Sequence, residues 1–381
     1  MDINAALDRF HFLSDVAVVG GAVRDSLLGR ESDDIDLATS DTPDVAKEKC
    51  RIREIDTYDT GVEHGTVTAV VDGEDFEITT FRRDVSTDGR NATVSFADGI
   101  RQDLRRRDFT INAMANQMDP GKGTVLVDPF GGVEDLINER IRAVGDPEER
   151  FREDLLRIVR MFRFARRYGF DVGAEEMAAA GQLAEEVVEN VSPERVVMEI
   201  EKAMKDSRPE KFLSDLSGLG IFEDFLGDTV YNFDPNPVGE PEEPEDRFLV
   251  FLIEVFDGTL LDWTDIQDAL RLSNERIRQA KRLSLLFEIF DTPISEKNKA
   301  KVLAPYRDSI EDAKRIGPEA YGIPENRFHT TRELEPVVTG QDFLDVGIEE
   351  GPRVGELVDK AHNIQLEEDI TDKEELVERA L

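Results

Sequence analysis

Cysteine and histidine are nearly absent from this chain of 381 residues, which has one cysteine and four histidines. Cys50 has no second cysteine for an intrachain disulfide, and a lone cysteine cannot build a thiolate zinc site. The histidines are too scattered to form a cluster: His11, His64, His329 and His362. Any metal ion that the protein binds should therefore be held by oxygen ligands.

Long apolar runs are also missing, since no segment approaches the roughly 20 apolar residues that a membrane-spanning helix needs. The first ten residues, MDINAALDRF, lack the basic and then apolar order of a signal peptide. We therefore expect a cytoplasmic protein with no membrane partner. The length predicts two or three domains of roughly 100–200 residues each. Hydrophobic residues make up 39% of the chain, which is enough to bury real cores.

Basic residues are few, because 47 of them stand against 84 acidic residues and the net charge is −37. This balance argues against a nucleic-acid binder, which is normally basic. Arginines are nevertheless concentrated in residues 101–107 (RQDLRRR) and 150–167 (RFREDLLRIVRMFRFARR). A dispersed acidic surface with few lysines is typical of proteins in concentrated salt, where the Debye length is about 3 Å at 1 M. A halophilic source is our hypothesis, and an ordinary acidic cytosolic protein is the alternative.

The order of predicted elements is α/β at the front of the chain and helical behind it. A strand at 16–19 leads through Gly20-Gly21 into a helix that ends at Gly29. Three further strands and a helix follow, at 35–38, 67–71, 76–81 and 151–168, with a hairpin turn at Asp72-Gly73. Residues 235–247, rich in proline and glutamate, are predicted to be a linker or exposed loop.

The pair Asp34 and Asp36 is the first candidate for chemistry. Residues two apart in a strand point to the same side, and two carboxylates so close repel unless a cation lies between them. Oxygen ligands favour Mg²⁺. Taken alone, the pair is better explained as an acidic strand edge. The glycine turn upstream offers free backbone N–H groups to phosphate, and Arg24 can add a bidentate contact, which strengthens the functional interpretation.

A phosphate-binding turn followed by two carboxylates is the arrangement for metal-assisted nucleotidyl transfer. Glu77 is a third candidate, because Phe76, Ile78 and Thr80 take one face of their strand and leave Glu77 on the other. From that face it could reach the metal ions. The residues alone leave two interpretations of Glu77 about equally supported: this role near the metal ions, and an ordinary outward-facing glutamate.

Eight motifs follow one another in an order that resembles the class II tRNA nucleotidyltransferases, the CCA-adding enzymes, and the similar bacterial poly(A) polymerases. They are GGAVRDSLLGR, DDIDLATS, GVEHGTVTAV, FEITTFRRD, DLRRRDFTINAMA, DPFGGVEDL, RAVGDPEERFREDLLRIVRMFRFA and VSPERVVMEIEKAM. The segment from VVTGQDFLDVG to the end is similar to the tail of bacterial CCA-adding enzymes. The resemblance is dense in the first half of the chain and returns at the C-terminus.

The resemblance implies roles for particular residues. Asp34 and Asp36 would bind the catalytic metals, which we take to be two Mg²⁺ ions. Glu77 would lie beside the primer hydroxyl. The implied nucleotide-binding residues are Gly20, Gly21, Arg24 and Asp25 of the phosphate motif, Arg106, Arg107, Asp108 and Asn112 of RRDFTINA, and Asp154, Arg157, Arg160 and Arg163 of the helical motif. The implied RNA-binding residues are Arg90, Arg167 and Arg195.

The resemblance makes Asp154 and Arg157 the pair that reads the incoming base, and chemistry agrees with that role. Cytosine and adenine each present an amino donor beside a ring-nitrogen acceptor, which a carboxylate beside a guanidinium complements. Uracil and guanine present the reverse pattern and would face unpaired polar groups. The residues alone favour a plainer alternative, an i,i+3 ion pair on a helix worth only ~0.2–0.5 kcal/mol.

Two further regions bear on RNA. Residues Arg157, Arg160, Arg163 and Arg167 form one helical stripe, which we assign to the triphosphate and the RNA end because a cationic stripe is costly in an acidic chain unless it meets phosphate. In the family, residues 84–96 would be a flexible loop that matters when addition switches from C to A. The family's Arg-His-Pro is here Arg90-Asn91-Ala92, so this loop departs from the pattern.

The predicted fold is α+β, with a nucleotidyltransferase head of the polymerase-β type that contains a mixed sheet, followed by an all-α neck, body and tail. The boundaries are 1–138 for the head, 139–215 for the neck and 216–381 for body and tail. The predicted activity is CCA addition to tRNA from CTP and ATP, with the acceptor and TΨC arms as contacts. Poly(A), CC-only or A-only addition is the first alternative, and a non-catalytic tRNA-binding protein is the second.

Overall fold

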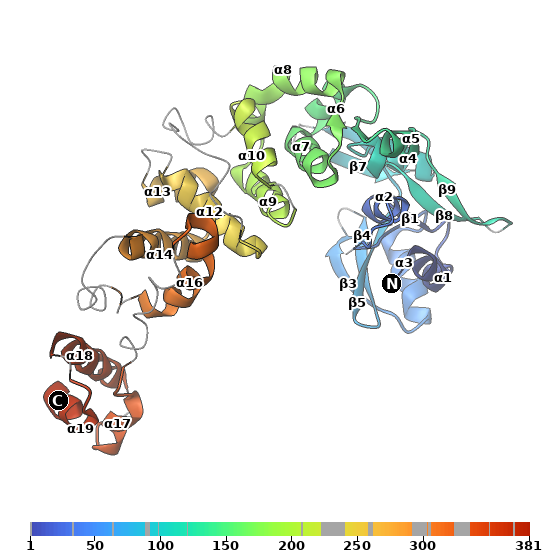
Figure 1. Cartoon of the computed structure of the whole chain (residues 1–381). Helices are drawn as coiled ribbons and strands as arrows, with labels where there is room; N and C mark the ends of the chain where they lie inside the picture. The colour runs from blue at the N-terminus through green and yellow to red at the C-terminus, as the bar shows by residue number, and fades with distance from the viewer. Residues whose placement is uncertain are drawn as a thin grey trace. The chain divides into compact units, whose positions relative to one another are not determined.

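The computed structural model consists of two compact units, residues 1–228 and 229–381, which are described separately (Figure 1). The description covers residues 2–32, 34–62, 65–87, 92–97, 99–119, 121–206, 209–221, 241–257, 262–291, 303, 306–323, 336–349, 351–368 and 370–381. In this part of the chain, none of the helices is both long enough and apolar enough to span a bilayer.

A mixed sheet forms the core of the first unit, as predicted, but it has seven strands. Its strands, in spatial order, are β3 (Asp56–Gly61), β4 (Thr66–Val71), β5 (Glu74–Thr80), β2 (Asp36–Thr39), β1 (Ala17–Val19), β8 (Ala115–Asp119) and β9 (Gly123–Val127). Of these, β3, β8 and β9 were not predicted. Strands β2 and β5 run parallel, and the other neighbouring pairs are antiparallel. The parallel pair is central to the site because it places residues from distant segments side by side.

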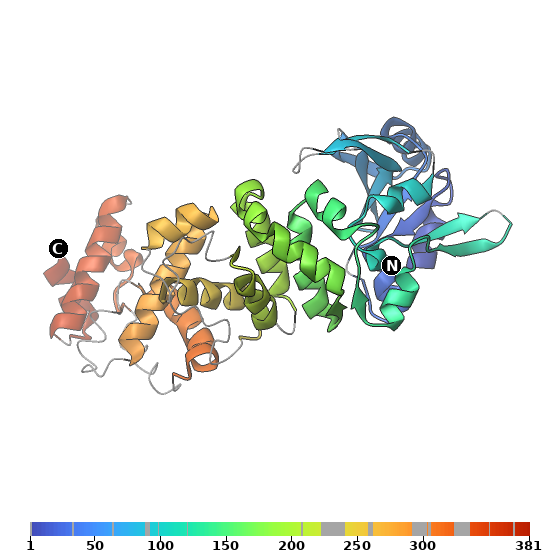
Figure 2. The same cartoon turned by 90° about the horizontal axis from the view of Figure 1, so that it is seen from above.

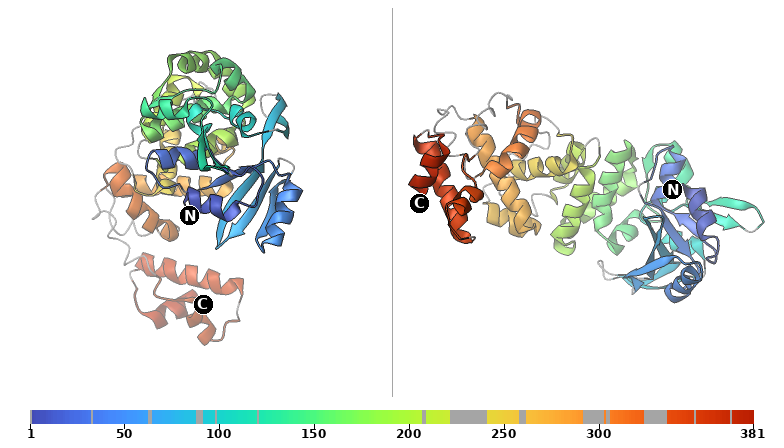
Figure 3. Two further views of the ribbon diagram at one scale, coloured as in Figure 1. Left: turned by 90° about the vertical axis from the view of Figure 1, so that its right-hand side faces the viewer. Right: turned by 90° about the horizontal axis from the view of Figure 1, so that it is seen from below.

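Two helices cover one face of this sheet, α1 (Ile3–Phe10) and α3 (Pro43–Ile52) (Figure 3). Asp2 caps α1 by accepting a hydrogen bond from the N–H of Ala5 at 2.8 Å. The helix buries its apolar side, and Phe10 packs on Phe76 of β5 with ring centroids 5.2 Å apart. Since the apolar side chains of β5 point toward these helices, the polar ones point to the opposite face.

The predicted hairpin of β4 and β5 is confirmed. Asp72 and Gly73 both have positive φ, 55° and 85°, as a two-residue turn of type I′ requires. The predicted strand and helix around the glycine turn are confirmed as β1 and α2 (Gly21–Leu27).

The loop expected at 84–96 is largely a second hairpin. Its strands are β6 (Arg82–Thr87) and β7 (Ala92–Phe96), which pair in antiparallel fashion. The prediction overlooked the short runs of β-branched residues on either side of the turn, which favour strands. Arg90, assigned to RNA, lies outside the described residues, as do its neighbours from 88 to 91.

The rest of the first unit is mainly helical, and Figure 2 shows the neck helices in green beside one another. The head adds α4 (Ile100–Arg105), a short 3₁₀ turn, η2 (Thr110–Asn112), and α5 (Gly132–Ile137). Strands β10 (Arg140–Ile141) and β11 (Asp171–Val172) form a small parallel sheet. The helices of the predicted neck are α6 (Pro147–Glu153), α7 (Leu156–Tyr168), α8 (Ala174–Asn190), α9 (Pro193–Ala203) and α10 (Pro209–Gly218), the last of which continues past the predicted boundary at 215.

The predicted continuous helix over 151–168 is wrong, because the chain leaves the helical conformation at Asp154. Its backbone is extended, with φ −157° and ψ 103°, and it separates α6 from α7. The Asp154 side chain accepts a hydrogen bond from the N–H of Leu156 at 3.2 Å, so it satisfies a donor at the start of α7. The apolar periodicity continues across this break, which is why the sequence did not reveal it.

The second unit is helical. One group contains α12 (Pro244–Asp257), α13 (Trp263–Leu270), α14 (Asn274–Asp291) and α16 (Arg307–Tyr321), and the other contains α17 (Gly340–Asp345), α18 (Pro352–Glu368) and α19 (Lys373–Ala380), drawn in red in Figure 3. The second group buries its own cluster around Phe343. Residues 235–240 of the predicted linker lie outside the described residues, whereas 244–247 form the first turn of α12 and correct that prediction.

Candidate nucleotidyl-transfer site

A pocket of about 700 Å³ opens on the uncovered face of the sheet, where α7 and α9 of the neck also line it. It brings together all predicted catalytic and nucleotide-binding residues: Gly20, Gly21, Arg24, Asp25, Asp34, Asp36, Glu77, Arg106, Arg107, Asp108, Asn112, Asp154, Arg157, Arg160 and Arg163. Arg167 lines it too. These residues span more than a hundred positions of the chain, so only the fold makes them neighbours.

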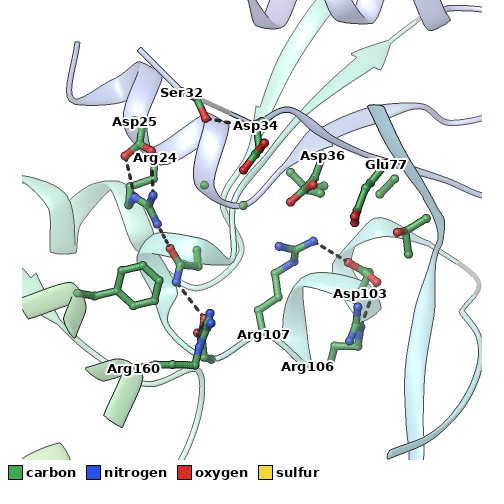
Figure 4. Close-up of a pocket in the computed structure, with 18 of the residues that line it drawn as sticks. Arg24, Asp25, Ser32, Asp34, Asp36, Glu77, Asp103, Arg106, Arg107 and Arg160 are labelled. Atoms are coloured by element: carbon green, nitrogen blue, oxygen red, sulfur yellow. Dashed lines mark hydrogen bonds and ion pairs between the residues drawn. The ribbon is translucent and has the colours of Figure 1, made fainter. Parts of the chain in front are cut away.

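Three carboxylates lie side by side in this pocket (Figure 4). Asp34 precedes β2, Asp36 begins it, and Glu77 lies in β5. The parallel register pairs Leu37 with Ile78, so Asp36 and Glu77, one step earlier on each strand, share the open face. The prediction that Asp34 and Asp36 point to the same side is confirmed.

The crowding of carboxylates in this pocket makes ionisation of Asp36 and of Glu77 more costly. Removal from bulk water inside the pocket raises the pKa of Asp36, Arg107 opposes this shift, and the charge of Asp34 adds to it. The pKa of Glu77 is raised by removal from water and then by the charges of Asp36 and Asp34. A pocket with crowded negative charge is one in which a bound cation is favourable.

The donor set of the pocket fits a hard divalent cation. Among the described residues, no group of three or more Asp, Glu, His or Cys side chains has the geometry to hold a metal ion alone. The pair Asp34 and Asp36 supplies carboxylate oxygens on one side, and the rest of the pocket is open to water and ligand oxygens. Mg²⁺ typically binds through one or two carboxylates with waters and substrate phosphates completing the shell. The residues therefore fit Mg²⁺ bound together with a phosphate ligand.

The glycine turn passes very close to Arg107. Gly20 has φ 72°, a left-handed conformation that favours glycine, and a methyl group there would lie 2.5 Å from Nη1 of Arg107. The guanidinium of Arg107 therefore lies against the turn and also near Asp36 (Figure 4). A cation at this position would meet an anionic ligand seated on the turn.

Asp103 anchors the two arginines of the second motif, and the sequence analysis missed it. This buried carboxylate accepts hydrogen bonds from Nε of Arg106 at 3.1 Å, Nη2 of Arg107 at 3.4 Å and the N–H of Arg82 at 3.1 Å. Burial alone would raise the pKa of Asp103, but Arg107 and Arg106 outweigh it and hold the pKa below its usual value. The i,i+3 and i,i+4 spacing in RQDLRRR was the signal that could have found it.

Asp108 is nearly fully buried at the wall of the pocket. It accepts hydrogen bonds from Nε and Nη2 of Arg160 at 2.9 and 2.7 Å, and from Nδ2 of Asn112 at 3.0 Å. Burial opposes ionisation, yet Arg160 and Asn112 hold the pKa of Asp108 far below its usual range. This carboxylate therefore acts on the pocket through the groups it holds.

Asp154 and Arg157 do not form the i,i+3 ion pair that was the plainer alternative. Oδ2 of Asp154 accepts from Nη2 of Arg195 at 2.9 Å, whereas Nη1 of Arg157 donates to Glu153 at 2.6 Å. Nη2 of Arg157 donates to the carbonyl of Arg106 at 3.0 Å, so it spans neck and head. Arg195, predicted to contact RNA, donates the hydrogen bond to Asp154, and its role toward RNA stays a prediction.

The arginine stripe of α7 is partly neutralised from within the fold. Glu199 of α9, a buried residue that the sequence analysis missed, accepts from Nε of Arg163 at 2.5 Å and lies 3.6 Å from Nη1 of Arg160. Burial opposes ionisation of Glu199, but these arginines lower its pKa. The expectation that only phosphate could offset the stripe is therefore corrected.

Comparison with known proteins places this pocket in a family. Residues 16–142 match a model described as the "Poly A polymerase head domain", and residues 169–230 match the "Probable RNA and SrmB- binding site of polymerase A". The CCA-adding enzyme of Pediococcus pentosaceus is 30% identical over 91% of this chain and 88% of that protein. The chain belongs to the CCA-adding enzymes.

Other members of the family are similar over different lengths. The CCA-adding enzyme of Levilactobacillus brevis is 44% identical, over 54% of this chain and 50% of that protein. The structure of the Bacillus stearothermophilus CCA-adding enzyme in complex with CTP has a TM-score of 0.74 and 28% identity, and covers 99% of this chain and 95% of that one. The fold predicted from the sequence is thereby confirmed as that of a CCA-adding enzyme.

Two lysines of the neck also line the pocket and were missed. Lys202 contacts Glu199 at 3.0 Å, and Lys205 follows one turn later on an exposed surface. Lysine is scarce in this chain, so a lysine pair within three residues was a signal that the sequence analysis could have used.

Proposed function

We propose that this protein adds C, C and A in turn to the 3′ end of tRNA, taking the nucleotides from CTP and ATP without a template. The observation that carries the proposal is that Asp34, Asp36 and Glu77 share one pocket with Asp154 and Arg157. Relatives support the substrates, because CCA-adding enzymes have been solved with CTP and with ATP.

In the reaction, the 3′ oxygen of the tRNA forms a bond to the α-phosphorus, and the bond from that phosphorus to the pyrophosphate oxygen breaks. Asp34 and Asp36 would hold Mg²⁺, two ions in our assignment. When bound, Mg²⁺ neutralises charge on the α-phosphate and lowers the pKa of the attacking hydroxyl. Glu77 accepts a hydrogen bond from that hydroxyl and orients it.

The protein's own cations hold the triphosphate. The Gly20 turn offers backbone N–H groups, and Arg106 and Arg107, fixed by Asp103, face the same space. Asp154 accepts from the amino group of cytosine or adenine, and Arg157 donates to the neighbouring ring nitrogen. Uracil and guanine are rejected because they would leave these groups unpaired.

We assign the head to residues 1–138, the neck to 139–215 and the tRNA-binding body and tail to 216–381. The acceptor and TΨC arms are the proposed tRNA contacts, with Arg90 and Arg167 near the RNA end and Arg195 supporting Asp154. In the second unit, residues 271–282 (RLSNERIRQAKR) contain several basic side chains and one acid, Glu275. Such a run in an acidic protein favours contact with RNA phosphates.

The deciding experiment incubates a tRNA transcript that lacks CCA with CTP, ATP or both, and sequences the 3′ ends. We expect two C residues with CTP alone and a complete CCA with both. Unlimited A addition would identify a poly(A) polymerase, which the match to the poly A polymerase head domain keeps as the competing activity. Addition that stopped at CC, or that required CC already present, would identify a partial enzyme.

A second proposal concerns the environment, which we take to be the cytoplasm of a halophile. At a net charge of −37, repulsion among carboxylates opposes the compact state and salt screens it. We expect the thermal unfolding midpoint and the rate of C addition to rise as KCl increases from about 0.1 M to about 2 M, where the Debye length falls from about 10 Å to under 3 Å. Full activity and stability in dilute buffer would contradict this proposal.

A further inference from the structure

A series of hydrogen bonds connects the C-terminal end of α7 to the head. The hydroxyl of Tyr168 donates to Oδ1 of Asp25 at 2.8 Å. Asp25 in turn accepts from Nε and Nη2 of Arg24 at 3.0 and 2.9 Å. The guanidinium of Arg24 stacks over the Tyr168 ring, with Cζ 4.6 Å from the centroid. All three side chains are buried, so each contact forms away from water.

The series of hydrogen bonds ends on α7 again, about two helical turns before Tyr168. Nη1 of Arg24 donates to Oδ1 of Asn112, whose Nδ2 donates to Asp108, and Asp108 accepts from Arg160 (Figure 4). Arg160 and Tyr168 are eight residues apart and thus lie on one face of α7. The ring of contacts is therefore closed, with its two ends on the same helix.

Phe164 lies inside this closed set of contacts. It lies midway between Arg160 and Tyr168 on α7, and Cζ of both Arg24 and Arg160 lies 5.3 Å from its ring centroid. We name this assembly the head–neck clamp. Its members are Arg24, Asp25, Asp108, Asn112, Arg160, Phe164 and Tyr168.

We infer that Tyr168 is a positioning residue, which through the head–neck clamp fixes the nucleotide-selecting neck relative to the metal-binding carboxylates of the head. The pocket's lining, among the described residues, includes Phe164 but not Tyr168, so Tyr168 acts on the reaction through its contacts with lining residues, and its hydroxyl does so through Asp25 and Arg24. The inference rests on the proposed function, because it names what holds the two halves of that site in register.

The same geometry changes the role of Arg24. The resemblance placed it among the phosphate contacts, yet each of its three guanidinium nitrogens already donates to Asp25 or Asn112. Its side chain is 5% exposed. Arg24 therefore acts on the nucleotide indirectly, by holding the head against α7.

The test measures steady-state C addition for Tyr168→Phe, Arg24→Lys and the double variant. Tyr168→Phe removes one hydroxyl and leaves the ring in place, whereas Arg24→Lys keeps the charge but cannot contact Asp25 and Asn112 together. We expect kcat to fall about tenfold in each, with KM for CTP within about twofold, because misalignment affects the reacting geometry more than binding. The preference for CTP over UTP should fall by a similar factor.

The double variant carries the decision. Because both substitutions break the same closed set of contacts, we expect the fall in kcat of the double variant to stay near that of the worse single variant. It should not reach the product of the two single losses. Tyr58→Phe, on the exposed edge strand β3, is the matched control and should behave as wild type. If Tyr168→Phe does not fold, Asp25→Asn takes its place with the same expected loss.

Three results would overturn the inference: a silent Tyr168→Phe variant, multiplied losses in the double variant, or an Arg24→Lys variant that raises KM for CTP at unchanged kcat. The last is the signature of a direct phosphate contact. Failure of the wild-type protein to add C would instead refute the proposed function, so the two failures are distinguishable.

Discussion

Replacing Asp36 with asparagine should abolish nucleotide addition, with a loss of about a thousandfold or more in the rate of C addition. The amide keeps the shape of the side chain but removes the negative charge that attracts a divalent cation. Asp36 begins β2 beside Glu77, with Asp34 two residues earlier, so no other carboxylate can take its position. The same substitution relieves repulsion among the three carboxylates, so we expect the protein to remain folded.

The measurement is the single-turnover rate of C addition to a tRNA transcript lacking CCA, at saturating CTP and Mg²⁺. Asp56→Asn is the matched control, because Asp56 is an exposed aspartate at the start of the edge strand β3. It makes the same chemical change outside the pocket and should retain the wild-type rate. An Asp36→Asn variant with more than about a tenth of wild-type activity would show that this pair does not hold the catalytic metal.

The part of the site that the head strands contribute was predicted well, because it depends on residues that are close in the sequence. The alternation of residues in a strand separated Glu77 from Phe76 in β5. Asp34 and Asp36 line one pocket as predicted, although Asp34 lies just before β2 rather than within it. The turn at Asp72-Gly73 followed from the conformation that a tight hairpin requires. These features depend on neighbouring residues, and the structure confirmed them.

The rest of the site depends on contacts between distant segments, which the sequence does not display. Asp103 and Glu199 belong to a chain with 84 acidic residues. The spacing to Arg106 and Arg107 was a local signal for Asp103, whereas the partners of Glu199 lie 36 and 39 residues away on another helix, where no local pattern marks them. The break at Asp154 interrupts an otherwise helical pattern, where the Asp154 side chain accepts from the N–H of Leu156 and from Arg195 of another helix. The arginine stripe was predicted from spacing, but its partners on α9 were not.

Base selection gives the second large expected effect. Replacing Asp154 with asparagine should lower the preference for CTP over UTP about a hundredfold, as the ratio of the two kcat/KM values. The carboxylate repels the O4 oxygen of uracil, whereas an amide can donate to it, so the variant loses its main means of rejecting UTP. Addition of C should also slow, since one acceptor for the cytosine amino group is lost.

Asparagine is preferred to alanine here because Asp154 has two structural contacts besides its proposed role. Its oxygens accept from the N–H of Leu156 and from Arg195, and alanine would remove both acceptors and leave the half-buried Arg195 without its carboxylate partner. Asp171→Asn, an exposed aspartate of β11, is the matched control and should keep the wild-type ratio. If Asp154→Asn discriminated between CTP and UTP as well as wild type, the base would be read by other groups, and the contact between Asp154 and Arg195 would remain as a purely structural brace of the neck.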